Sequence, residues 1–184
     1  MKEVKGTIFV TIVKSIKANP NSRGKYDDIL SDKAKELLNQ RILVATWYPL
    51  EQYREIYDAI CLFEGKNDPK ILHQWGRDEA NRWFTTVYKF SVIEGDLKLA
   101  TEKYSRFHRM VHNYGEILSE FLSDNELVFT YKDIPRDWKN WYLIAAGYAN
   151  RFIELCINKK VNFFFLNKSW INNKWTKLKL SWII

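Results

Sequence analysis

The sequence has little of what builds disulfide frameworks, linkers or membrane spans. Its two cysteines, Cys61 and Cys156, cannot form a disulfide framework. Four prolines and seven glycines in 184 residues argue against a linker or a low-complexity segment. No stretch approaches 18 uncharged apolar residues, so a membrane-spanning helix is excluded. These features predict a soluble, cytoplasmic chain that forms one domain over residues 1–184.

Aromatic side chains, by contrast, are abundant. The chain has 8 Trp, 10 Tyr and 11 Phe, which together make up 16% of its residues. Such a content can fill a substantial core and still line an apolar pocket. The net charge of +7 is local, because residues 159–184 contain six lysines and no acid. The rest of the chain is therefore close to neutral, which limits any basic surface to the C-terminal segment.

Apolar residues recur with the spacing of a helix in some segments of the chain and with the alternation of a strand in others. A helix or a strand-to-helix entry is expected over about 7–18. The helical period predicts further helices over a short segment opened by Ser31-Asp32, 50–63, 69–92, a segment between Gly95 and Gly115, and 136–157. A polar turn is expected at 19–24. The period of two predicts a hairpin over 117–122 and 126–131, and a second hairpin over 161–166 and 176–182. The fold class is therefore α+β, with N-terminal helices packed on an antiparallel sheet of two hairpins separated by a helix.

The last predicted strand has a basic face. Lys177 and Lys179 share that face with Trp175, a combination that single-stranded nucleic-acid binders use. Lysines on an outer strand also protect a sheet from aggregation, and we favour that interpretation. Nucleic-acid binding through the C-terminal hairpin is kept as an alternative function.

Histidine spacing suggests a metal site only at first sight. His108 and His112 are four residues apart on a predicted helix, where they could share a metal ion. A third protein ligand is missing from the pattern, and Arg106 and Arg109 would repel a cation. We therefore expect no metal site.

A haem site would need an axial histidine on an apolar helix face, and His108 meets that minimum. The adjacent Tyr104-Ser105-Arg106 superficially resembles the tyrosine-serine-arginine signature of haem nitric-oxide sensors. Those sensors space the three residues alternately, so that they converge on the haem propionates. Contiguous helical residues point about 100° apart and cannot converge in that way. The sequence thus predicts no cofactor, and haem-based gas sensing remains an alternative.

No catalytic set is visible in the sequence. Cys61 and Cys156 lack a neighbouring histidine or a C-x-x-C partner, and each is interpreted as a small buried hydrophobe. Cys61 is the better candidate for a modified thiol, because aromatic residues flank it. Glycine-rich phosphate loops and nucleophile elbows are also missing. We expect a non-enzymatic protein with no catalytic residues.

Several short motifs, in order, resemble a known superfamily. They are Lys5-Gly6-Thr7, Trp47-Tyr48-Pro49-Leu50-Glu51, Thr85-Thr86-Val87-Tyr88, His112-Asn113-Tyr114-Gly115-Glu116, Ile134-Pro135 and Leu178-Lys179-Leu180-Ser181-Trp182. This order is similar to that of an uncharacterised bacterial family related to the 4-vinyl reductase (V4R) domain. The same superfamily includes core subunits of the transport protein particle tethering complex and haem nitric-oxide sensor domains. V4R-like members tend to carry cysteines in the final hairpin, and this chain has none there.

The resemblance implies a sensory or adaptor domain that is often dimeric and that encloses an apolar pocket. We therefore expect a small apolar ligand, a protein partner or both, and a homodimer formed through helix faces. The expected pocket residues are aromatic or apolar and come from three predicted helices: Trp83, Val87, Tyr104, His108, Trp141 and Tyr148.

Overall fold

A computed structural model describes residues 1–18 and 23–183, which form two compact units. Unit 1 consists of Met1–Asn67 together with Arg109–Tyr114. Unit 2 consists of Asp68–His108 and Gly115–Ile184. Because the chain returns to unit 1 for six residues in its middle, no single change of composition marks the boundary. The sequence indicated one domain without an internal boundary. The two units are still expected to act as one functional domain, and this stays a prediction.

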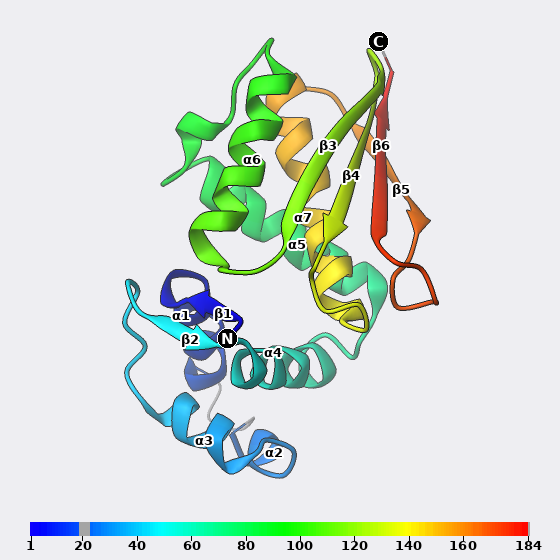
Figure 1. Ribbon diagram of the computed structural model, residues 1–184. Coiled ribbons are helices and arrows are strands. Elements are labelled where there is room, and N and C mark those ends of the chain that lie inside the picture. The colour runs from blue at the N-terminus through cyan, green and yellow to red at the C-terminus, as the bar shows by residue number, and fades with distance from the viewer. Residues whose placement is uncertain (19–22, 184) are drawn as a thin grey trace. The chain divides into compact units, whose positions relative to one another are not determined.

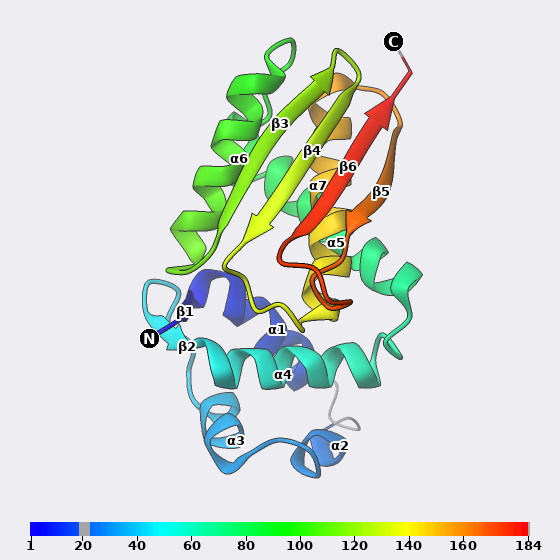
Figure 2. The same ribbon diagram turned by 45° about the vertical axis from the view of Figure 1, so that its right-hand side comes forward.

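Unit 1 is mainly helical (Figure 2). Its helices are α1 (Gly6–Ala18), α2 (Arg23–Asp27), α3 (Asp32–Asn39) and α4 (Leu50–Phe63), and its strands β1 (Glu3–Lys5) and β2 (Trp47–Pro49) pair antiparallel. The Ser31 hydroxyl caps α3 by accepting a hydrogen bond from the Ala34 N–H, as its position before the helix predicts. Residues 19–22 of the predicted turn lie outside the described residues, and Gly24 belongs to α2.

The core of unit 1 is built on aromatic rings. The fully buried Phe9 of α1 contacts Tyr48 edge-on at 5.6 Å and Tyr53 at 5.3 Å between ring centroids. An isolated bridge between Val4 and His112 joins the 109–114 segment to β1. These contacts hold β1, β2 and the first turns of α1 and α4 in one block.

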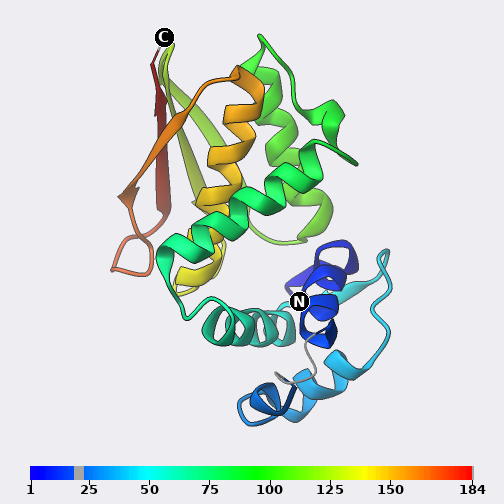
Figure 3. The same ribbon diagram turned by 180° about the vertical axis from the view of Figure 1, so that it is seen from behind.

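Unit 2 packs helices against one face of a four-stranded sheet (Figures 1 and 3). The helices are α5 (Pro69–Phe84), the short 3₁₀ helix η2 (Lys89–Ser91), α6 (Leu97–Val111) and α7 (Lys139–Ile157). The strands are β3 (Glu116–Ser123), β4 (Glu126–Lys132), β5 (Val161–Asn167) and β6 (Thr176–Trp182), in the order β3-β4-β6-β5, with every pair antiparallel. The predicted α+β class and both hairpins are confirmed.

Alternation along β6 follows the predicted pattern. Every second residue from Thr176 to Trp182 is buried, whereas Lys177 and Lys179 are half-buried on the other face. Leu178 pairs with Phe129 of β4 in the register, so two buried apolar residues meet on the helix-covered side. The alternation thus fixes which face of the sheet receives the helices.

The helix predicted over 69–92 is wrong at its C-terminal end. Helix α5 stops at Phe84, and the chain continues through a turn into η2. Thr85 and Thr86 donate their hydroxyl hydrogens to the carbonyl oxygens of Asn81 and Arg82. Such back-bonding by Thr competes with helix continuation, which explains the early end.

Helices α5 and α7 cross with their backbones in unusually close approach. A Cβ atom placed on Gly76 would overlap the carbonyl oxygen of Ile144, and one placed on Gly147 would overlap that of His73. Only glycine permits this distance between the helices. The crossing therefore sets the positions of every side chain on the facing sides of α5 and α7.

Across the part of the chain that is described, none of the helices is long and apolar enough to cross a membrane.

Candidate functional site

Aromatic rings from three helices and one strand form a buried cluster in unit 2. Phe84 of α5 lies 4.6 Å from Phe152 and 5.3 Å from Tyr148, both on α7. Tyr104 of α6 lies 5.0 Å from Phe129 of β4 and 5.1 Å from Phe152. This aromatic cluster occupies the space between α5, α6, α7 and the inner face of the sheet.

Phenol groups give the aromatic cluster its few polar atoms. The hydroxyl of Tyr148 is buried and has no hydrogen-bond partner among the described residues. Burial raises the pKa of Tyr148, Tyr104 and Tyr131 well above the usual range for tyrosine. These phenols therefore stay protonated at neutral pH and can act only as hydrogen-bonding groups.

His108 lies on α6, one turn beyond Tyr104, and is 4% exposed. The indole ring of Trp141 on α7 meets the imidazole edge-to-face, with 6.1 Å between ring centroids. Gly115 lies beside the same imidazole with a φ of +70°, and a Cβ atom there would be 3.5 Å from His108 Nε2 and would overlap Ile134. Glycine at position 115 thus places no side chain of its own against His108 Nε2.

The expected pocket residues do not all come together. Trp83, Tyr104 and Tyr148 belong to one group of rings, since Tyr104 lies 6.0 Å from Tyr148 and Phe107 links Trp83 to Tyr148. His108 and Trp141 form the neighbouring pair. Val87 departs from the expectation, because it follows the end of α5 and its side chain is 62% exposed.

Four further cluster members were missed as site residues: Phe84, Phe107, Phe129 and Phe152. Phe107 and Phe152 stand on the apolar stripes of their helices, which is the signal that could have added them. Phe84 and Phe129 come from different elements, so only the tertiary structure brings them to the same place.

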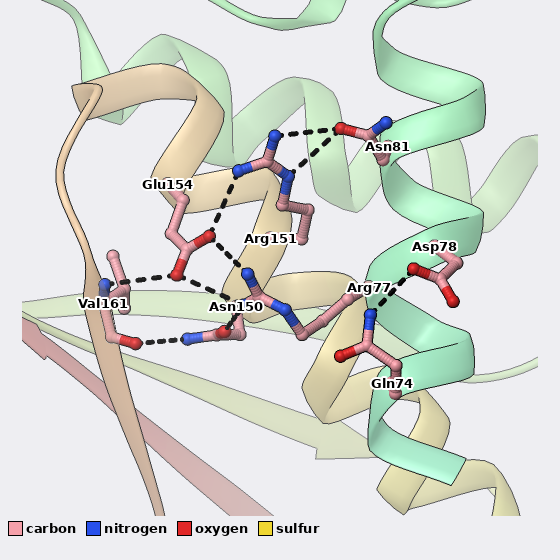
Figure 4. A network of polar contacts seen from close by, with 8 residues as sticks. All are labelled: Gln74, Arg77, Asp78, Asn81, Asn150, Arg151, Glu154 and Val161. Atoms are coloured by element: carbon pink, nitrogen blue, oxygen red, sulfur yellow. Dashed lines mark hydrogen bonds and ion pairs between the residues drawn. The ribbon is translucent and has the colours of Figure 1, made fainter. Parts of the chain in front are cut away.

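A part-buried polar network joins α5, α7 and β5 on another side of the same helices (Figure 4). Glu154 accepts hydrogen bonds from Arg77 at 2.8 Å and from Arg151 at 3.2 Å, and its carboxylate is 9% exposed. Asn150 accepts a hydrogen bond from Arg77 and donates one to the carbonyl oxygen of Val161 at 2.8 Å. The arginine–glutamate network ties the start of β5 to the α5–α7 crossing.

The ionisation of Glu154 reflects two opposed effects. Burial by itself raises the pKa of the carboxyl group, but the hydrogen bond and charge of Arg77, the Val161 N–H and Arg151 lower it overall. The carboxylate is therefore ionised at neutral pH, and its charge is balanced by two guanidinium groups. All its contacts are internal, so we interpret this network as structural.

His73 differs from His108 in its surroundings. Its ring stacks on Phe163 of β5 at 4.1 Å, and its buried Nε2 has no hydrogen-bond partner within the described residues. Burial and the charge of Arg77 lower the pKa of His73 to about 4, against an opposing effect of Glu154. Among the residues that the structure describes, no three His, Cys, Asp or Glu side chains gather into a metal-binding group.

Both cysteines are buried and unpaired by disulfides. Burial raises the pKa of Cys156 to about 11, and burial together with Asp58 raises the pKa of Cys61 further. Each thiol is protonated at neutral pH, a state in which it is a poor nucleophile. The burial of both cysteines agrees with their interpretation as small buried hydrophobes.

The basic face of the C-terminal hairpin is partly neutralised. Lys179 forms an ion pair with Glu126 at 2.5 Å, and Lys174 lies over the Trp175 ring at 5.1 Å from its centroid. These contacts are typical of a solvated sheet face. Nucleic-acid binding at this hairpin stays an untested alternative.

Comparison with known proteins gives a clear answer for the fold. No family model matches the chain, and no curated protein matches its sequence. Among solved structures, it is similar to an H-NOX protein from S. oneidensis in the Fe(II)NO state, with 14% identity, a TM-score of 0.66 and coverage of 98% of this chain and 99% of the other. A point mutant of the T. tengcongensis H-NOX protein gives 14% identity, a TM-score of 0.61 and 98% coverage of both chains.

A third structure agrees with these two. The Fe(II) unliganded H-NOX protein from K. algicida is 10% identical, with a TM-score of 0.63 and coverage of 98% of this chain and 97% of the other. The chain therefore has the α+β fold of H-NOX (haem nitric oxide/oxygen binding) domains. This likeness to H-NOX structures concerns the fold alone, and the relation to V4R domains stays a prediction.

The expectation of a chain without a cofactor is wrong in the light of this likeness. The similar structures are described as Fe(II) proteins or by the distortion of their haem. The contiguous spacing of Tyr104, Ser105 and Arg106 argues only against the propionate contacts of haem nitric-oxide sensors. It carries no information about a ligand to the haem iron. The likeness itself concerns the fold, because the similar structures are only 10–14% identical to this chain.

Proposed function

We propose that the chain is a haem-binding sensory domain in which His108 supplies the iron ligand. The observation that carries the proposal is the buried imidazole of His108 on α6, which lies against the Trp141 indole in the core of unit 2. A neutral imidazole nitrogen in apolar surroundings is the donor that haem iron commonly takes from proteins. The likeness in fold to H-NOX proteins supports the same assignment.

The residues around His108 fit the iron better than they fit the haem carboxylates. Trp141 contacts the imidazole edge-on and would restrict its rotation, as residues around metal-binding histidines commonly do. The chain contains no Tyr-x-Ser-x-Arg sequence, so the propionate contacts of haem nitric-oxide sensors do not carry over. Bound haem would supply an iron centre able to take a diatomic gas, and the protein would supply the fixed imidazole and an apolar surround.

The three histidines of the chain allow a matched test. We expect the protein to bind about one equivalent of ferric haem, measured by the change in Soret absorbance during titration. Replacement His108→Ala should weaken binding by more than the roughly 10–100-fold typical of a residue that only supports a ligand. His73→Ala and His112→Ala should change affinity by less than about threefold, which is within about 1 kcal/mol.

Folding of each variant is checked by far-ultraviolet circular dichroism before titration. A His108→Ala protein that is folded and retains the wild-type affinity and Soret spectrum would contradict the assignment. A wild-type protein that binds no stoichiometric haem would contradict the proposed function itself.

We further propose that the domain is non-enzymatic and works as a homodimer or with a protein partner. No paired carboxylates or activated nucleophile accompany His108 among the contacts described above. Sensory domains transmit a ligand-dependent change through an interface, and a helix-face dimer would provide one. Light scattering of the purified protein measures the oligomeric state directly.

A further inference from the structure

The segment that leads from α3 into Trp47, the first residue of β2, exposes five consecutive uncharged residues. Leu43 is 52% exposed, Val44 57% and Trp47 36%, and the intervening Ala45 and Thr46 are also exposed. This 43–47 loop projects from unit 1 beside the start of α1 (Figure 2). Single exposed apolar residues are common on protein surfaces, but Leu43, Val44 and Ala45 are exposed in succession and Trp47 follows after Thr46, a pattern that indicates an interaction site.

The backbone of the 43–47 loop is held in one shape by internal hydrogen bonds. The Leu43 N–H donates to the Tyr48 hydroxyl at 2.7 Å, and the Thr46 N–H donates to the Leu43 carbonyl oxygen at 3.1 Å. The Gly6 N–H donates to the Thr46 carbonyl oxygen at 2.8 Å, and the Thr7 hydroxyl donates to the Val44 carbonyl oxygen at 2.9 Å. These bonds satisfy most of the polar groups of the turn without water.

Internal satisfaction of the loop backbone matters for the choice of partner. An unsatisfied peptide group costs several kcal/mol when it leaves water for hydrocarbon, so loops rarely enter a lipid phase. Here the carbonyl oxygens of Leu43, Val44 and Thr46 already accept hydrogen bonds from the protein. The 43–47 loop can therefore bring its side chains to the boundary between headgroups and acyl chains while these three carbonyl oxygens keep their hydrogen bonds.

Cations frame the same loop. Lys5 lies with its Nζ 5.6 Å from the centroid of the Trp47 ring, and the exposed Arg41 precedes Leu43 by two residues. The nearest acid on β1, Glu3, accepts a hydrogen bond from Asn113 at 2.9 Å. Trp beside Lys and Arg is characteristic of groups at the boundary between lipid headgroups and acyl chains.

We propose that the 43–47 loop docks the protein onto an anionic lipid surface. Leu43 and Val44 enter the boundary between headgroups and acyl chains, Trp47 lies at that boundary, and Lys5 and Arg41 pair with lipid phosphates. The contact is peripheral and needs no spanning helix. It is also independent of haem, since it depends on residues of unit 1 alone.

Other exposed apolar side chains offer weaker cases. Phe90 is 62% exposed, but Lys103 lies over its ring at 5.8 Å and donates a hydrogen bond to its carbonyl oxygen. Phe164 on the edge strand β5 is 67% exposed, but an irregularity between Phe165 and Asn167 interrupts the strand. Such bulges protect edges from pairing with another chain.

Vesicle sedimentation tests the docking proposal. Wild-type protein should sediment with vesicles of phosphatidylcholine and phosphatidylglycerol in a ratio of about 3:1, a mixture that presents an anionic surface. The double variant Leu43→Ser/Val44→Ser should bind at least about tenfold more weakly, because two aliphatic side chains no longer leave water. The charge variant Lys5→Glu/Arg41→Glu should lose binding to a similar extent, most strongly at low salt.

The matched control is Val87→Ser, which changes an aliphatic residue of similar exposure at 62% in unit 2 and should bind like wild type. Circular dichroism confirms that all variants are folded. Failure of the wild-type protein to bind these vesicles would overturn the proposal. Vesicle binding by the Leu43→Ser/Val44→Ser variant that equals wild type would also overturn it. If that variant kept vesicle binding but lost self-association in light scattering, the loop would be a contact between copies of the chain and the proposal would be wrong.

Discussion

Replacement Gly147→Ala should destabilise the protein by about 3 kcal/mol or more, the upper end of the range for overpacking. The new methyl group would overlap the carbonyl oxygen of His73, so α5 and α7 could not keep their present approach. In an open helix, the same change would stabilise by about 1 kcal/mol, because Ala has the higher helix propensity. The measurement is urea unfolding followed by circular dichroism.

Gly24→Ala is the matched control for this experiment. Gly24 lies in α2, and a Cβ atom placed there would have no heavy atom within 4 Å. Its replacement should leave the stability unchanged or raise it slightly. If Gly147→Ala proved as stable as the wild type, the close crossing of α5 and α7 would be wrong.

Replacement Glu154→Ala should cost about 2–4 kcal/mol, somewhat less than the loss of a fully buried ion-pair partner, because water partly screens the arginines. The change leaves Arg77 and Arg151 without their shared carboxylate and removes an acceptor for the Val161 N–H. Glu102→Ala on the exposed side of α6 should stay within about 0.5 kcal/mol of wild type.

The contribution of Glu154 should also depend on pH. Its pKa is lowered in the folded protein, so folding favours the ionised form. The stabilisation is therefore complete above the unfolded value of about 4.3 and is lost as the pH falls through the folded-state pKa. The difference in unfolding free energy between wild type and Glu154→Gln should shrink below that pH. A difference that stays constant from about pH 7 to about pH 3 would show that Glu154 acts without its charge.

The sequence predicted the elements of unit 2 well, for identifiable reasons. Strict alternation along β6 fixed both the strand and its buried face, and the stripe containing Tyr104, Phe107 and His108 fixed the inner side of α6. The length of α5 was overestimated, because periodicity does not detect the threonine back-bonds that end the helix. Local patterns therefore identified which residues are buried better than where each element stops.

The polar network could not be predicted from the sequence in the same way. Arg77 and Glu154 are 77 positions apart, and each looks like an ordinary charged residue of a solvated helix face. The available signal was a glycine inside each helix, since Gly76 and Gly147 are costly there unless something packs closely against them. The position of Gly115 beside His108 could not be predicted either, because it depends on the left-handed backbone conformation of Gly115 after α6.

The most direct test of the haem assignment is chemical rescue at His108. The variant His108→Gly removes the imidazole and leaves a space in which free imidazole can bind. The protein is titrated with ferric haem in the presence and absence of imidazole, and the Soret band is recorded. Our account predicts that His108→Gly binds haem poorly, and that imidazole restores the wild-type Soret band in this variant. Haem binding by His108→Gly that equals wild type without imidazole would contradict it.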